Sequence, residues 1–344
     1  MLNANGHKNF TASQDKEAEM LLSGVLAKMK ETLDGTPLCV VLGGSYGRGE
    51  GGVRQDRENG IIYNDLDFFV FAERKMDHAE SLLQDIARKY EKELHVDVDF
   101  SPVTTVKQIK KNARRLMMQE LKRGYKLVAG TDLLAQYLPE FPAEKLPFSE
   151  ACRLLFNRGM GLLMAGEKIK NNSPESDFIM RNICKALLGC GDAILIAGGE
   201  YRWRISERMA ALENSDLPEK WKALYREAVE FKYSPHRQLK PDMTAYWQSA
   251  AEFFRAAVLR TAGCSNAESL TGAIYLCCKK SGEVSLKNLL IYSVKTRSLP
   301  LTEMKRYMAP AVAGILPELY RQLDKLPVFP VQKSKLYQFW LIFN

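Results

Sequence analysis

Two short stretches decide the expected fold: LCVVLGGS at residues 38–45 and IIYNDLDFFVF at residues 61–71. Each carries an apolar run of strand length, and the first run ends in two glycines and a serine. This pattern predicts a strand, a tight turn and the start of a helix, followed by a second strand. A third apolar stretch, LHVDVDF at residues 94–100, predicts another strand, and residues 77–90 predict a helix. Residues 38–100 therefore read as the core of a small α/β domain.

The segments around this core set the domain organisation. Apolar residues at helical spacing predict a helix over 14–33, and residues 104–128 read as mainly helical, whereas 53–60 read as a polar loop. After about residue 145 helical periods dominate, at 148–170, 177–197, 217–232, 242–262, 265–280, 285–297, 301–325 and 332–343. The sequence thus predicts an α+β protein, with a small mixed-sheet domain at 1–142 and a larger all-helical domain at 143–344.

The carboxylates of the core are the main chemical signal. Asp65 and Asp67 alternate with apolar residues, so in a strand they share one face, about 7 Å apart. Asp97 and Asp99 repeat the arrangement in the third predicted strand. Carboxylates this close repel one another, and a divalent cation neutralises them. A single pair would more often lie on a solvated strand face, but two pairs on neighbouring strands favour a two-metal site.

The turn Gly43-Gly44-Ser45 is a weaker signal of phosphate binding. Glycines allow a ligand to approach the backbone, the helix start offers N–H groups, and the serine hydroxyl can donate to a phosphate oxygen. A plain tight connection is the alternative interpretation. The turn matches neither a P-loop nor a dinucleotide-binding fingerprint.

The order of these features, GGS, then Asp65-Leu66-Asp67 on the next strand, then an aspartate on a third, resembles the DNA polymerase β-type nucleotidyltransferase superfamily. The resemblance covers about residues 38–100 and extends loosely to bacterial members with a C-terminal helical domain. It implies that Gly43, Gly44 and Ser45 hold the phosphates of a nucleoside triphosphate such as ATP. It also implies that Asp65 and Asp67 bind two magnesium or manganese ions, with Asp99 as third carboxylate and base, and Asp97 as its rival.

The sequence departs from that family in one spacing. Gly44 and Asp65 are 21 positions apart, about twice the usual separation, which predicts an inserted loop over residues 50–60. Arg48 belongs to a GRGE run seen in some bacterial members and is a candidate phosphate contact, or else a solvated helix arginine.

One predicted helix of the C-terminal domain carries a polar stripe: Asn182, Lys185, Gly189 and Asp192. We expect Lys185 to reach the triphosphate or the acceptor from a cleft between the domains. A hydrogen-bond network between helices is the alternative interpretation of the same stripe.

The composition of the chain indicates the cellular compartment and the kind of ligand to expect. Seven cysteines without regular spacing, no apolar leader and no long apolar run predict a cytoplasmic protein without a membrane span. The net charge of +8 suits polyanionic ligands but is common in other proteins. The apolar tail LYQFWLIF is expected to dock on the body of the protein and could support a homodimer.

The predicted function is magnesium-dependent transfer of a nucleoside monophosphate from a nucleoside triphosphate to an acceptor hydroxyl. The acceptor is left open among a small molecule, a protein side chain, RNA and a second nucleotide. The alternatives are a catalytically degenerate regulatory or antitoxin module and a metal-dependent glycosyltransferase with a DxD motif.

Overall fold

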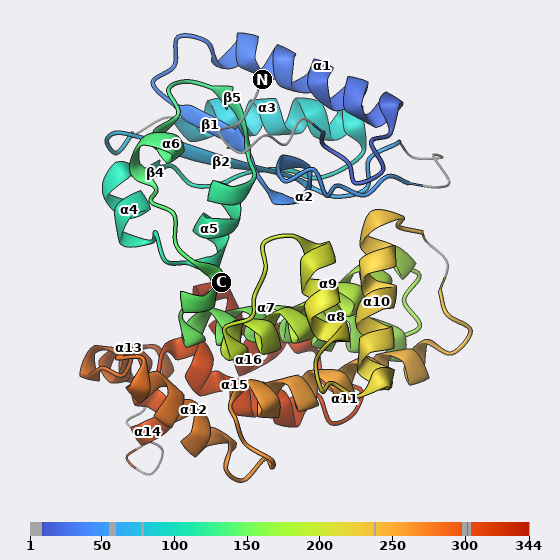
Figure 1. Cartoon of the computed structure of the whole chain (residues 1–344), viewed down its shortest axis with the longest axis vertical. Helices are drawn as coiled ribbons and strands as arrows, with labels where there is room; N and C mark the ends of the chain where they lie inside the picture. The colour runs from blue at the N-terminus through green and yellow to red at the C-terminus, as the bar shows by residue number, and fades with distance from the viewer. Residues whose placement is uncertain are drawn as a thin grey trace. The chain divides into compact units, whose positions relative to one another are not determined.

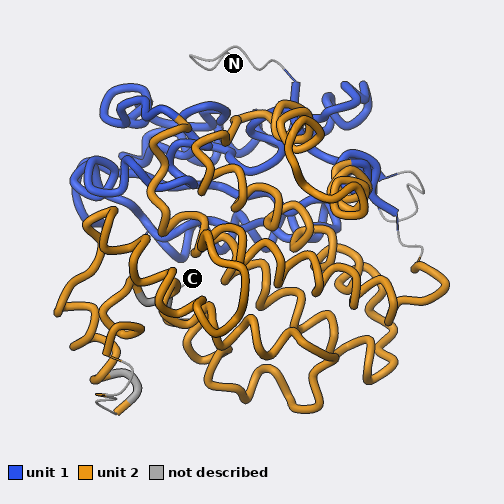
Figure 2. Tube along the Cα trace, turned by 60° about the horizontal axis from the view of Figure 1, so that its bottom comes forward, with its two compact units in different colours: residues 1–142, 230–236 blue, residues 143–229, 237–344 orange. Residues whose placement is uncertain are grey.

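The computed structural model describes residues 9–54, 60–76, 79–236, 239–297, 301 and 304–343. The chain divides into two compact units, coloured separately in Figure 2. Unit 1 comprises Met1–Pro142 and Glu230–His236, and unit 2 comprises Ala143–Val229 and Arg237–Asn344. A segment of seven residues from the middle of the chain therefore belongs to the N-terminal unit, which the sequence pattern does not reveal.

Unit 1 is built on a mixed five-stranded sheet, which confirms the predicted α+β class. Its strands are β1 (Cys39–Leu42), β2 (Leu66–Ala72), β3 (Val98–Phe100), β4 (Thr104–Thr105) and β5 (Lys126–Ala129). The order is β3-β2-β1-β5, with β4 also paired to β2. The central strand β1 is antiparallel to β2 and β5, whereas β3 and β4 run parallel to β2.

Helices cover both faces of this sheet (Figure 1). On one face α1 (Lys16–Leu33) and α3 (Ala79–Leu94) pack on Val40, Leu42, Phe68 and Val70. On the other face α4 (Val106–Lys111), α5 (Leu116–Arg123) and α6 (Leu133–Tyr137) pack on Cys39, Val41 and Phe71. All four residues of β1 are consequently buried, which explains why its sequence is an unbroken apolar run rather than an alternating one.

Two predicted boundaries in unit 1 are wrong, and a third region contains strands that were not predicted. The strand expected over 61–71 begins only at Leu66, because the hydroxyl of Tyr46 accepts hydrogen bonds from the backbone N–H groups of Tyr63 and Asn64. The strand expected over 94–100 is reduced to β3, because α3 continues to the buried Leu94. The region 104–128 is mainly helical, as predicted, through α4 and α5. It also contains the short strands β4 and β5, which are too brief for a periodicity to identify.

Unit 2 is helical throughout the part that the structure describes. Its helices are α7 (Phe148–Lys170), α8 (Ser176–Gly198), α9 (Ile205–Glu213), most of α10 (Glu219–Tyr233), α11 (Met243–Thr261), α12 (Leu270–Lys280), α13 (Leu286–Thr296), α14 (Met304–Met308), α15 (Ala311–Gln322) and α16 (Lys335–Phe343). The predicted helix over 301–325 is split into α14 and α15, separated near Pro310, and α9 was not predicted. None of the described helices has the length and apolar composition of a membrane span.

Candidate active site

The glycine turn stands at the carboxyl end of β1 in unit 1. Gly43 is the N-cap of α2 (Gly44–Gly47), a helix of a single turn. The N–H of Gly43 donates to the carbonyl oxygen of Asp67 at 2.8 Å, which continues the β1–β2 ladder by one more pair. The turn is thus fixed directly opposite the second aspartate of the DxD motif.

Gly44 shows how close the turn and this carboxylate are. Its φ of +60° lies in the left-handed region, and a Cβ atom placed on it would stand 2.3 Å from Oδ2 of Asp67. No other residue type fits that position without displacing the carboxylate or straining the backbone. The 21-residue separation between Gly44 and Asp65 therefore leaves the turn and the carboxylate motif in direct contact. Residues 55–59 of the predicted inserted loop lie outside the described residues.

The carboxylates gather at the start of β2 and β3. Asp67 pairs with Asp99 across the two parallel strands, so both side chains leave the same face of the sheet. The next pair in register, Phe68 and Phe100, stacks its rings on the opposite face at 4.9 Å. Asp65 and Asp97 each lie one residue before a strand, rather than within it as the sequence suggested. The register thus brings Asp99, and not Asp97, beside Asp67.

The electrostatics of Asp99 agree with this clustering. Partial burial raises the pKa of its carboxyl group, and the negative charges of Asp65, Asp97 and Glu91 raise it further. A carboxylate whose neighbours are also negative is stabilised by a bound cation. The site therefore has an electrostatic reason to bind positive charge.

The geometry of these carboxylates shows what kind of metal site they could form. Within the described ranges, no group of three or more His, Cys, Asp or Glu side chains is arranged as a preformed metal site. Magnesium, however, is usually held by one or two carboxylates together with substrate phosphate oxygens. Asp67 and Asp99, in register beside the glycine turn, supply that kind of partial set. The residues fit magnesium bound together with a nucleotide better than a resident metal bound by protein alone.

Tyr46 organises the approach to the DxD motif, a role that the sequence interpretation missed. Its buried hydroxyl donates to the carbonyl oxygen of Gly52 at 2.8 Å, besides accepting from Tyr63 at 2.9 Å and Asn64 at 3.2 Å. The side chain of Asn64 accepts from the N–H of Gly52 at 3.0 Å. Burial raises the pKa of Tyr46, so its hydroxyl stays protonated. One phenol thereby joins the GGSY turn to the YNDLD segment.

Lys232 is the second functional candidate that sequence reasoning missed. It lies near the end of α10, in the segment that belongs to unit 1, and its ammonium donates to Oγ of Ser45 at 3.2 Å. The same ammonium stands 3.9 Å from the carboxylate of Glu50, and both side chains are mostly buried. The backbone of this segment lies close against Gly52: a Cβ atom added to Gly52 would stand 2.6 Å from the carbonyl oxygen of Lys232. No motif around residue 232 could have revealed this, because the contact joins residues 187 positions apart.

Arg48 is held by carboxylates of unit 1. Its guanidinium lies 3.4 Å from Glu50 and 3.4 Å from Glu120, and only 15% of its side chain is exposed. Its aliphatic stem packs on Gly124, where an added Cβ atom would stand 2.7 Å away. The solvated helix arginine considered from the sequence is therefore wrong, and a phosphate contact by Arg48 stays a prediction.

The polar stripe on α8 has a structural role at its C-terminal end. The buried Asp192 accepts from the hydroxyl of Tyr225 at 2.8 Å and forms an ion pair with Arg208 at 2.9 Å. Arg208 in turn donates to the hydroxyl of Tyr201 at 3.0 Å. This is the hydrogen-bond network between helices that the sequence left open as the alternative. Lys185 lies half-buried on α8 in unit 2, and its contact with a nucleotide stays a prediction.

Comparison with known families agrees with part of this interpretation. Residues 5–97 match the model of the family described as "Putative nucleotidyltransferase DUF294". The matched range includes the glycine turn, Asp65, Asp67 and Asp97, and it ends two residues before Asp99. No curated protein matches the chain. The family match supports a nucleotidyltransferase-type function.

Proposed function

We propose that unit 1 binds a nucleoside triphosphate with magnesium and transfers its nucleoside monophosphate to an acceptor hydroxyl. The observation that carries the proposal is the contact of Asp67 with Gly44, together with the register of Asp67 and Asp99. The glycine turn and the carboxylate cluster therefore lie side by side. The family match over residues 5–97 supports the same class of reaction.

The phosphate end of the substrate would lie at the glycine turn. Gly44 leaves the backbone open to close approach, and the hydroxyl of Ser45 would donate to a phosphate oxygen. The ammonium of Lys232, 3.2 Å from Ser45, would add a positive charge at the same place. Since α2 has only one turn, its dipole is small, and we assign most of the phosphate binding to these groups.

The carboxylates would hold the metal and accept the proton. Asp65, Asp67 and Asp99 would bind magnesium through oxygen atoms, completed by phosphate oxygens of the substrate. When bound, the ions neutralise phosphate charge and lower the pKa of the acceptor hydroxyl. Asp99 would take the proton of that hydroxyl, because it lies in register beside Asp67 at the same edge of the sheet.

The reaction is a single displacement at the α-phosphate. A bond forms between the acceptor oxygen and the α-phosphorus, while the bond to the bridging oxygen breaks and pyrophosphate leaves. Most of the rate would come from positioning and from charge stabilisation. The acceptor is a small molecule, a protein side chain, RNA or a second nucleotide.

The test is calorimetric binding of ATP, GTP, CTP and UTP to the full chain, with and without magnesium. We expect magnesium-dependent binding of at least one triphosphate, lost in the Asp65→Asn, Asp67→Asn double variant. Asp85→Asn, on the exposed surface of α3 and paired with Arg88, is the matched control and should bind as the parent does. Lys232→Met should weaken triphosphate binding about tenfold while the variant stays folded, since it removes a charge-assisted hydrogen bond to phosphate.

The outcomes separate the proposal from its rivals. Pyrophosphate release from the triphosphate in the presence of an acceptor would support nucleotidyl transfer. Release of a nucleoside diphosphate from a nucleotide-sugar donor, with the sugar moved to the acceptor, would favour a glycosyltransferase. Binding without turnover on any of the four acceptor classes would indicate a degenerate regulatory module. A folded protein that binds none of the four triphosphates would overturn the proposal.

A further inference from the structure

The segment that contains α4 in unit 1 carries a cluster of positive charge. Between Asp99 and Glu120 the sequence has no acidic residue. Its basic residues lie on α4 and on the turn that joins α4 to α5, and all of them are exposed: Lys107, Lys110, Lys111, Arg114 and Arg115. We call Lys107, Lys110, Lys111 and Arg114 the basic strip. Among the residues that the structure describes, none of these four forms an ion pair.

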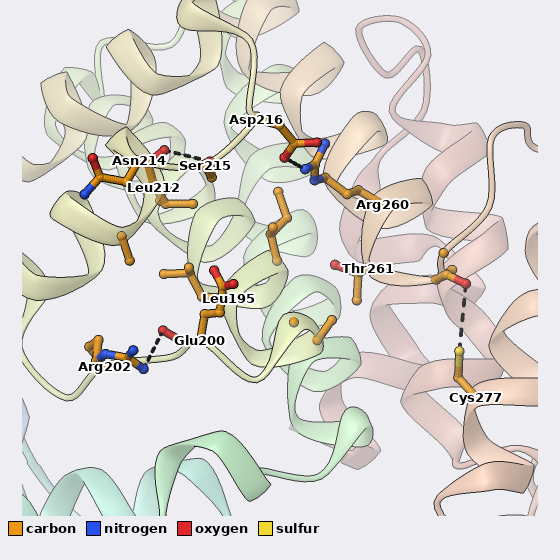
Figure 3. A pocket seen from close by; sticks show the side chains of 16 residues that line it. Leu195, Glu200, Arg202, Leu212, Asn214, Ser215, Asp216, Arg260, Thr261 and Cys277 are labelled. Carbon is orange, nitrogen blue, oxygen red and sulfur yellow. Dashed lines mark hydrogen bonds and ion pairs between the residues drawn. The ribbon is translucent and has the colours of Figure 1, made fainter.

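The charges of the basic strip are less compensated than those around the cavity in unit 2. In the lining of that cavity Arg260 pairs with Asp216, and Arg202 donates to the carbonyl oxygen of Glu200 at 3.1 Å (Figure 3). In the basic strip, by contrast, neighbouring cations are three and four residues apart, the spacing at which like charges on a helix repel each other. A ligand with several negative charges would relieve this repulsion.

Two half-buried aromatic rings lie beside the basic strip. The ammonium of Lys110 stands 5.0 Å from the ring centroid of Tyr137, at the end of α6, and the guanidinium of Arg114 stands 5.5 Å from that of Phe141. The fold brings these rings to cations that are 27 positions away in sequence. Aromatic rings among cations are the combination that binds single-stranded nucleic acids, because bases stack on the rings while phosphates contact the cations.

The basic strip covers the face of the sheet from which the candidate carboxylates project. Asp67 points to the same side of β2 as Phe69 and Phe71, and both of these rings pack with residues of α4, α5 and α6 (Figure 1). The strand β4 leads into α4 and pairs with β2 at Phe71, four residues or about 13 Å along the strand from Asp67. A stacked strand rises 3.4 Å per nucleotide, so about four nucleotides would cover this distance.

We propose that the basic strip, together with Tyr137 and Phe141, binds a single-stranded nucleic acid. Its phosphodiester groups would contact the four cations, and its bases would stack on the two rings. A base on either ring would have a cation at hand for its phosphate. A duplex keeps its base faces stacked inside, and a polyglutamate chain has charge but no planar rings, so neither would use both parts of this surface.

The bound strand would be the acceptor of the nucleotidyl transfer, a role that rests on the proposed function. A bond would form between the terminal hydroxyl oxygen of the strand and the α-phosphorus. The bond from that phosphorus to the bridging oxygen would break, pyrophosphate would leave, and the proton would pass to Asp99. The product is a strand that is longer by one nucleotide, whereas binding of the strand itself needs no triphosphate.

Fluorescence anisotropy on the full chain, without triphosphate, tests the binding. The probes are labelled 12-nucleotide strands of oligo(U) and oligo(dT), and whichever binds more tightly identifies RNA or DNA as the ligand. We expect saturable binding that weakens with salt, with a slope of about −3 in a double-logarithmic plot for four phosphate contacts. No saturable binding of either strand to the folded protein would overturn the proposal. Equal or tighter binding of a 12-base-pair duplex, or of polyglutamate of the same charge, would overturn it too.

Charge variants locate the strand on the protein. The Lys110→Gln, Lys111→Gln double variant should weaken binding about tenfold and reduce the salt slope by about 1.4, because two phosphate contacts are lost. The matched control is Lys89→Gln, Lys92→Gln on α3, which covers the opposite face of the sheet. It removes two exposed lysines, and Lys89 also stands over a ring, 5.1 Å from that of Tyr90. Equal weakening in the two double variants would show an effect of net charge alone and would refute the site.

The base contacts are tested with Phe141→Leu, which keeps an apolar side chain. This variant should weaken oligo(dT) binding at least about fivefold, and it should leave the affinity for an abasic strand of the same length unchanged. Equal affinities of the parent protein for oligo(dT) and the abasic strand would refute the stacking.

Failure of the proposed function and failure of this surface are distinguishable. The Asp65→Asn, Asp67→Asn double variant should bind the strand at least as tightly as the parent does, although it should not lengthen it. If the parent binds a triphosphate and modifies another acceptor but does not lengthen the strand, the acceptor role of the strand is wrong.

Discussion

Replacement of Gly44 by alanine tests the arrangement of the candidate active site most directly. The new Cβ atom would stand 2.3 Å from Oδ2 of Asp67, far inside normal contact, so the carboxylate must turn away. The φ of +60° adds a strain of about 1–2 kcal/mol for an L-residue. Turning Asp67 out of its rotamer adds about 1 kcal/mol. We therefore expect Gly44→Ala to lower the free energy of unfolding by about 2–3 kcal/mol.

Gly35 is the matched control for backbone strain. It also lies in unit 1 with a left-handed φ of +76°, but nothing stands within 4 Å of an added Cβ atom. Gly35→Ala should therefore show the strain of about 1–2 kcal/mol alone. The difference between the two variants isolates the contact with Asp67.

Two measurements decide this prediction. Urea denaturation gives the two losses of stability, and calorimetry with magnesium and the bound triphosphate gives the affinities. A shifted metal ligand should weaken metal-dependent binding roughly 10- to 100-fold in Gly44→Ala and leave Gly35→Ala unchanged. Equal affinities in the two variants would refute the placement of Asp67 as a metal ligand beside the turn. Equal losses of stability would refute the close contact itself.

Two other predictions concern stability. Burial lowers the pKa of Lys126 from 10.5 to about 8. Between pH 8 and pH 10.5 the unfolded chain therefore binds more protons than the folded protein. Because of this difference, the free energy of unfolding should rise with pH over that range. Lys126→Met should remove this rise and stabilise the protein at pH 7 by up to about 3 kcal/mol. Denaturation of the parent and the variant between pH 7 and 9.5 checks this prediction. A parallel rise in the free energy of unfolding of the parent and the variant would contradict the lowered pKa of Lys126. Asp192→Ala, which leaves the buried Arg208 without its carboxylate partner, should cost about 3–5 kcal/mol, whereas Glu252→Ala in the exposed Lys220–Glu252 pair should cost less than about 1 kcal/mol in the same assay. Similar losses in the two variants would show that burial of the pair has little effect.

The sequence predicts those helices and strands whose hydrophobic pattern is visible in their own residues. The strand β1 is fully buried and reads as an apolar run, and the register that pairs Asp67 with Asp99 continues the alternation visible in both segments. The long helices α7 and α8 are likewise recognisable from a periodicity sustained over six turns. In each case the pattern of apolar and polar residues within the element already shows which side chains are buried.

The missed features depend on contacts between distant residues. β5 has four residues and is defined by its pairing with β1, which no local pattern records. The late start of β2 results from the hydroxyl of Tyr46, which binds the backbone of Tyr63, 17 residues further along the chain. Lys232 is further still from Ser45 and lies on a helix whose residues 219–229 belong to unit 2. Such features require the tertiary structure, because the sequence around each residue is compatible with several other positions.

The inclusion of residues 230–236 in unit 1 has a consequence for synthesis on the ribosome. Lys232 reaches Ser45 only after residues 143–229 have been translated, at about 5–20 residues per second, so the N-terminal sheet must wait on the order of ten seconds for it. During that interval the hydroxyl of Ser45 lacks the ammonium that donates to it in the finished fold. A nascent chain of 142 residues therefore holds the aspartates and the glycine turn but not the lysine. The proposed nucleotide site would therefore gain its lysine only after residues 230–236 have been translated.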